Sequence, residues 1–152
     1  MQRLASQNLT RLSIAVQAIG ASVKIIKVGA VEKEIQEAIK NIGVSLESEE
    51  ITISDKDLSH AMREAKIEPL PSSVWEKLPD FLKSAKSVYW NNEKPGIIYV
   101  VETEKGLGKF VVLPNYKVGK GAKAKTTNNV RTGKRVKSFE EFLDPVYFTK
   151  LK

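Results

Sequence analysis

Apolar residues are concentrated in three runs between positions 88 and 113, and this stretch organises the rest of the chain. The runs cover residues 88–90, 97–101 and 110–113 and are rich in Val, Ile, Tyr, Trp and Phe, which favour strands. Short connectors that contain Gly or Pro separate them, as is typical of hairpin loops. The pattern therefore predicts a three-stranded antiparallel meander, to which residues 51–53 and 130–132 can add short strands.

Helical spacing is the second pattern along the chain. Residues 31–41 carry an apolar stripe at Ile35, Ala38, Ile39 and Ile42, which predicts an amphipathic helix. Further helices are predicted over residues 2–19, 55–66, 73–78, 80–85 and 138–143. Residues 23–28 fit either a continued helix or a short strand. We interpret residues 1–43 as a helical pair that packs on another surface, either within the chain or on a neighbouring chain.

Residues 117–129 break both patterns. They are polar, basic and glycine-containing, with too few large apolar side chains to bury. Such a composition predicts a mobile loop unless a ligand binds it.

Composition narrows the protein classes. The chain has 152 residues and no cysteine, so it fits one domain and contains neither disulfides nor thiolate ligands nor a cysteine nucleophile. No apolar run approaches the roughly 20 residues that cross a bilayer, and no signal peptide is evident. We therefore expect no membrane partner.

Positive charge is concentrated in the last third. Residues 105–152 hold 12 basic and 3 acidic residues, whereas the first 104 hold 13 and 15, within a total formal charge of +7. This asymmetry favours a polyanionic partner. The alternative is a basic tail that only increases solubility.

Candidate chemistry is limited. One histidine and no cysteine exclude ordinary zinc sites, and phosphate-loop, dinucleotide and serine-hydrolase motifs are absent, so neither metal nor cofactor is expected. His60 and Arg63 project from neighbouring points of the helix predicted over 55–66, away from its apolar side. They form either a solvated polar face or an acid–base group beside a cation. RNA cleavage by attack of a 2′-hydroxyl needs such groups and no metal.

A second cluster covers residues 123–137, where basic residues alternate with Thr and Asn. Lys and Arg attract phosphates, while Thr and Asn can bind sugars or base edges. Tyr89, Trp90, Tyr99 and Tyr116 offer stacking surfaces wherever they are exposed. Alternatively, these aromatic residues belong to the core.

The order of these features resembles the phage-associated nuclease domains of the barnase/EndoU/colicin/RelE-like superfamily, which occur at the C-terminal end of Mu F-type minor head proteins and in polymorphic toxins. The resemblance covers residues 50–136. It rests on a strand ending in ISD, an H-x-x-R helix, the segment LPSSVWEKLPDFLKSAKSVYW, the strands GIIYVVE and GKFVVLPNY, and a last strand NNVRT.

The resemblance implies a small α+β domain over residues 50–152. Helices would pack on one face of a small antiparallel sheet of about four strands. Residues 1–49 would form a helical N-terminal segment or linker that precedes it.

The resemblance also implies a site. Its catalytic residues would be His60 for proton transfer, Arg63 for phosphate neutralisation, and Tyr99 and Thr132 for positioning or donation. Its substrate-binding residues would be Lys109, Asn128 and Asn129. The basic cluster adds Lys123, Lys125, Arg131, Lys134 and Arg135 as candidates that would hold the RNA backbone.

The function implied is a metal-independent endoribonuclease, a phage or toxin effector that cleaves RNA such as tRNA or another structured RNA. It would act in the cytoplasm of a target or host cell, or accompany the virion. An immunity protein or phage head proteins would be further partners. Two alternatives stay open: a non-enzymatic phage head module whose basic loop contacts nucleic acid, and nucleic-acid binding without cleavage.

Overall fold

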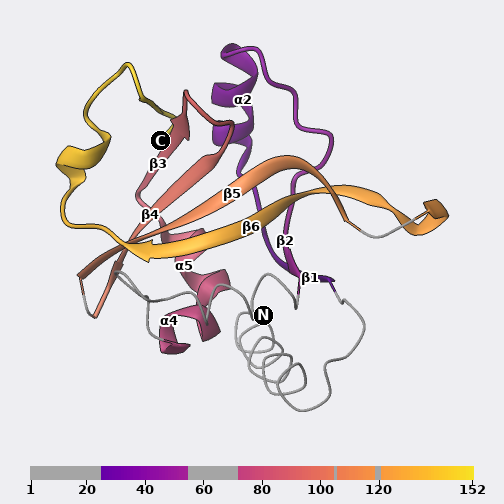
Figure 1. The fold of residues 1–152 in the computed structure, drawn as a ribbon, viewed down its shortest axis with the longest axis horizontal. Coiled ribbons are helices and arrows are strands. Elements are labelled where there is room, and N and C mark those ends of the chain that lie inside the picture. The colour runs from indigo at the N-terminus through magenta and orange to yellow at the C-terminus, as the bar shows by residue number, and fades with distance from the viewer. Residues whose placement is uncertain (1–24, 55–71, 105, 119–120) are drawn as a thin grey trace.

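The structure is a computed structural model that describes residues 25–54, 72–104, 106–118 and 121–152. Within these residues seven strands form one mixed sheet in the order β1-β2-β6-β5-β4-β3-β7 (Figure 1). The strands are β1 (Ile25–Ala30), β2 (Glu50–Ser54), β3 (Ser87–Asn91), β4 (Ile97–Thr103), β5 (Gly106–Val118), β6 (Lys125–Arg135) and β7 (Phe148–Lys150).

The predicted meander is confirmed. β3 and β4 are antiparallel, with Trp90 opposite Ile97. β4 and β5 are also antiparallel, with Ile97 opposite Val112. The β-branched and aromatic residues of β3 and β4 are buried on both faces of the sheet, which explains why they form nearly continuous apolar runs. In β5, Phe110 and Val112 are buried on one face and Val111 is half-buried on the other.

The predicted four-stranded antiparallel sheet with a helical segment before it is wrong. Residues 25–30 form a strand that pairs with β2, and β2 in turn runs parallel to β6. β7, only three residues long, extends the other edge by pairing with β3. Short apolar runs suit a helix or a strand equally well, so the sheet partner decided the conformation of residues 25–30.

Three α-helices occur in the described residues: α2 (Lys33–Asn41), α4 (Ser72–Glu76) and α5 (Leu78–Ser84). The stripe of α2 is confirmed in part, because Ile35 and Ile39 are fully buried in the same core as the sheet whereas Ile42 is exposed. The helix predicted over 55–66 lies outside the described residues. No helix within the described ranges is long and apolar enough to cross a membrane.

The main core lies between these helices and one face of the sheet. Trp75 packs edge-on against Phe110 of β5, with 5.2 Å between the ring centres. Tyr99 of β4 and Val130 of β6 belong to the same buried cluster. Since side chains alternate along a strand, the immediate neighbours of Tyr99 in β4 point to the opposite face of the sheet.

That opposite face is covered in part by the C-terminal segment, which contains the 3-10 helix η2 (Phe139–Phe142). Phe142 stacks on Tyr89 with 4.9 Å between ring centres, and both belong to a second cluster with Ile98 and Val100. The cover does not extend over the outer part of β6, where Thr132 is exposed. This leaves an accessible surface on β5 and β6.

Candidate nucleic-acid interface

β5 and β6 form a long basic hairpin. They contain 13 and 11 residues, and residues 105–139 include ten basic residues and no acidic one. Much of the mobile loop predicted over 117–129 is paired strand, because Lys117 is opposite Thr126 and Val118 is opposite Lys125. Cross-strand pairing satisfies the backbone groups of this segment without requiring large apolar side chains.

A group of polar side chains meets on the accessible face of this hairpin. Lys109 of β5 is directly opposite Lys134 of β6, and the next pair on that face is Val111 with Thr132. Directly opposite residues have Cβ atoms about 5 Å apart, so the two ammonium groups and the Thr132 hydroxyl flank one small area. We call Lys109, Thr132 and Lys134 the cationic patch.

One cation of the patch, Lys109, is held by residues of the C-terminal segment. The Lys109 ammonium is 3.0 Å from a carboxylate oxygen of Glu141 and 5.7 Å from the centre of the Phe142 ring. Like charges directly opposite each other repel, and the Glu141 carboxylate offsets this repulsion. Lys134 is exposed, so it can meet a ligand directly.

A bulge determines which way Thr132 faces. Val112 pairs with Val130 but Val111 pairs with Thr132, so Arg131 is the extra residue of a β-bulge. The bulge shifts the alternation by one position, as bulges beside functional sites often do. The guanidinium carbon of Arg131 lies 5.7 Å from the centre of the Tyr116 ring.

Gly133 completes this local arrangement. A Cβ atom there would lie 2.6 Å from Cζ2 of Trp75 and 2.9 Å from Cε1 of Phe110. A side chain would therefore collide with two core rings. The absence of a Cβ lets β6 lie directly on the core while the preceding Thr132 faces away from it.

Two asparagines anchor the base of the hairpin to residues 45–50. Asn128 is fully buried; its Nδ2 donates to the carbonyls of Ser48 at 2.7 Å and Glu50 at 3.0 Å, and its Oδ1 accepts from the backbone N–H of Asn115 at 3.2 Å. The Asn115 side chain donates to the Ser45 carbonyl and accepts from the Glu47 N–H, each at 2.9 Å. We call Asn115 and Asn128 the asparagine anchor.

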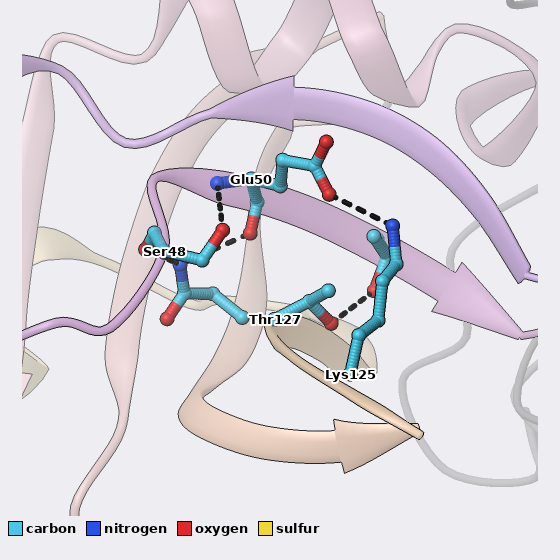
Figure 2. A network of polar contacts seen from close by, with 6 residues as sticks. Ser48, Glu50, Lys125 and Thr127 are labelled. Carbon is cyan, nitrogen blue, oxygen red and sulfur yellow. Dashed lines mark hydrogen bonds and ion pairs between the residues drawn. The ribbon is translucent and has the colours of Figure 1, made fainter. Parts of the chain in front are cut away.

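Contacts between β2 and β6 reinforce this anchor. Figure 2 shows the Lys125 ammonium meeting the carboxylate of Glu50, at 3.0 Å. The hydroxyl oxygens of Thr127 and Thr52 are 2.7 Å apart in a buried contact. The start of β6 is thus tied to β2 by both charged and neutral interactions.

The structure places Tyr99 away from the patch. Tyr99 is opposite Phe110, whose ring lies in the main core, whereas Thr132 is opposite Val111, which packs against the second cluster. Tyr99 and Thr132 therefore lie on opposite faces of the sheet. Burial, and secondarily the carboxylate of Glu32, raises the pKa of the Tyr99 phenol above its usual value, so the hydroxyl stays protonated.

The other predicted residues fall into four groups. Lys109, Thr132 and Lys134 are brought together. Asn128 and Asn129 are fully buried, and the Asn128 amide already bonds to the backbone of the chain. Exposed substrate-binding candidates are Lys125 near the far end of the hairpin and Arg131 and Arg135 beside the patch. His60, Arg63 and the side chain of Lys123 lie outside what the structure describes.

Four contributing residues were not predicted from the sequence. Asn115 was not selected, although it follows a proline in PNY and has a positive φ of 52°, a conformation in which Asn is enriched. Lys117 was assigned to a loop rather than to a strand. The ion-pair partners Glu50 and Glu141 had no local signal, because each pair joins distant parts of the chain.

No family model matches the chain, and searches of curated proteins and of solved structures likewise found no match. In the described residues no group of three or more His, Cys, Asp or Glu side chains could hold a metal ion.

Proposed function

We propose that the protein is an endoribonuclease that binds RNA on the cationic patch and cuts it by attack of a 2′-hydroxyl on the adjacent phosphate. The observation that carries the proposal is the convergence of two lysines and a threonine hydroxyl on the accessible face of β5 and β6. Cations at the phosphate stabilise the charge that develops there in the transition state.

Each group has a role in this reaction. Lys134, with Lys109 behind it, neutralises the non-bridging phosphate oxygens, and the Thr132 hydroxyl donates a hydrogen bond to one of them. His60 accepts the 2′-hydroxyl proton as the O2′–P bond forms and the P–O5′ bond breaks. The products are a 2′,3′-cyclic phosphate and a 5′-hydroxyl, which receives a proton. Arg63 adds a further positive charge at the phosphate.

The position of His60 in the chain is compatible with this role. β2 ends at Ser54 beside β6, and His60 follows six residues later. Six residues reach at most about 20 Å, so the imidazole can be delivered to the hairpin. Tyr99 has no part in the proposed reaction, because its hydroxyl is buried on the other face.

The test is cleavage of a labelled RNA by purified protein in the presence of EDTA. Wild type should cut the RNA and leave 2′,3′-cyclic phosphate ends, while a substrate with a 2′-deoxy sugar at the cleaved position should stay intact. His60→Ala and Thr132→Val should reduce the rate at least 100-fold and about 10-fold, respectively. Tyr99→Phe is the matched control that should keep wild-type activity. RNA that stays intact after long exposure to wild type would refute the proposal.

The resemblance also supports a role as a phage or toxin effector acting in the cytoplasm of a target or host cell. An exposed apolar stripe in residues 1–43 would favour the head-module alternative. In the described part of that segment, Ile35 and Ile39 of α2 are buried in the chain's own core, and Ile42 is exposed. Ribonuclease activity is therefore the better-supported function.

A further inference from the structure

The β5–β6 hairpin extends beyond its neighbours in the sheet. The register of β4 with β5 ends at Ile97 and Val112, and that of β2 with β6 covers only residues 51–52 and 128–129. β5 and β6 continue for three further pairs, up to Val118 and Lys125, as Figure 1 shows for the ribbon that reaches out to η1 (Gly121–Lys123). We call residues 116–118 and 121–127 the arm.

The arm is slender and positively charged. Lys117 is exposed, and so is Lys125, whose ammonium is paired with Glu50 of β2 at 3.0 Å. The small residues Gly121, Ala122 and Ala124 are exposed as well. No acidic residue occurs in the arm. A two-stranded ribbon is narrow enough to lie against the wide, shallow minor groove of an RNA helix, and small side chains keep this ribbon thin where it projects furthest.

The arm is held rigidly at its base. The asparagine anchor ties it to residues 45–50, and the Thr52–Thr127 contact ties it to β2. A projecting element that is already ordered loses little conformational entropy when it binds. The arm can therefore bind a ligand that lies outside the body of the domain at a small entropic cost.

The spacing of the cations indicates the size of that ligand. Lys109 in the patch and Lys117 in the arm are eight residues apart on β5, which corresponds to roughly 26 Å. A ligand that contacts both must present phosphates over this distance. A double-helical segment of RNA does so, and proteins recognise it through phosphates and 2′-hydroxyls.

The arm lacks the features that favour an unpaired strand. Single strands are bound by stacking bases on exposed aromatic rings. Tyr116 is the aromatic residue of the arm, and its ring carries the Arg131 guanidinium at 5.7 Å. The polar groups that the arm offers are instead the ammonium groups of Lys117 and Lys125, both exposed, and the hydroxyl of the half-buried Thr126.

From these observations we propose that the arm binds a helical segment of a structured RNA while the cationic patch holds the strand to be cut. This inference rests on the proposed function and specifies its substrate class.

The test compares binding of a labelled 16-base-pair RNA duplex with binding of one of its strands alone. In Lys117→Ser, duplex affinity should fall about fivefold or more at 0.1 M salt, and the salt dependence should weaken by about 0.9 in log–log slope, the contribution of one phosphate contact. Lys94→Ser removes the same charge from an exposed site on the β3–β4 loop; its loss of affinity should be much smaller. Circular dichroism checks that both variants are folded.

Cleavage distinguishes failure of this inference from failure of the proposed function. The arm variant should cut a short unpaired oligonucleotide as fast as wild type and a hairpin-containing RNA more slowly. Equal loss on both substrates, or equal duplex affinity of the arm and control variants, would overturn the role of the arm and leave the ribonuclease proposal standing. Stronger binding of a DNA duplex than of the RNA duplex would overturn the assignment to RNA. If wild type cuts neither substrate, the proposed function fails, and the inference that rests on it falls as well.

Discussion

Replacing Asn128 with alanine should destabilise the protein strongly, although the sequence suggested a substrate-binding role for this residue. The change removes three hydrogen bonds, of 2.7, 3.0 and 3.2 Å, from a fully buried side chain. Each such bond contributes about 1 kcal/mol, and partners left without water cost more. The half-buried Ser48 and Glu50 recover only part of this loss, so we expect a decrease of about 3–4 kcal/mol in the free energy of unfolding.

Asn92 offers a matched control. Its side chain also makes three bonds: Nδ2 donates to the carbonyls of Pro145 and Val146 at 3.3 Å, and Oδ1 accepts from the Thr149 hydroxyl at 2.9 Å. Asn92 is exposed, so water replaces these bonds. Asn92→Ala should therefore cost less than about 1 kcal/mol.

Urea unfolding followed by tryptophan fluorescence measures both changes, since Trp75 and Trp90 are buried. In thermal melts, Asn128→Ala should lower Tm by about 10 °C, at roughly 2–4 °C per kcal/mol for a chain of this size. The reasoning is refuted if Asn128→Ala lies within about 0.5 kcal/mol of wild type. Unchanged stability combined with lost RNA binding would instead make Asn128 a ligand contact.

Three further predictions follow from the same structure. Tyr99→Phe should stabilise the protein by about 1 kcal/mol, because no hydrogen-bond partner for its buried hydroxyl lies among the described residues, whereas Tyr147→Phe, at a side chain 45% exposed, should change little. Burial raises the pKa of Tyr99 in the folded state, so the contribution of Tyr99 to wild-type stability should be fully present below the pKa of the unfolded chain, about 10, and should decline above it. In urea melts at pH 9 and pH 11, wild type should therefore lose more stability between the two pH values than Tyr99→Phe. Equal losses in the two proteins would contradict the burial argument. Glu141→Gln frees the Lys109 ammonium from its 3.0 Å ion pair and should raise RNA affinity about two- to fivefold at low salt; an unchanged or weaker affinity in fluorescence anisotropy would exclude Lys109 from binding. Gly133→Ala should cost about 1–3 kcal/mol because its Cβ meets Trp75 at 2.6 Å, while Gly29→Ala, whose nearest neighbour would be 3.7 Å away, should be close to neutral in the same unfolding assay.

Local patterns in the sequence were sufficient for the central part of the fold. The meander follows from β-branched and aromatic runs separated by turn residues, and the buried stripe of α2 follows from helical spacing. The basic character of the β5–β6 hairpin is also visible directly, because residues 106–135 contain eight basic residues and no acidic one. These features depend on residues that are near one another in the chain, so the sequence displays them without knowledge of the fold.

The neighbours of each strand and the faces of the sheet were decided by the tertiary structure. Alternation shows which residues of one strand share a face, but it does not show which distant strand lies alongside, as when Thr52 meets Thr127 across 75 residues. Nor does it show where a bulge shifts the alternation, as at Arg131. For this reason the sequence could nominate Tyr99, Thr132 and Asn128 together, whereas packing places the first in the core, the second on the accessible face and the third in the hydrogen bonds that hold the arm.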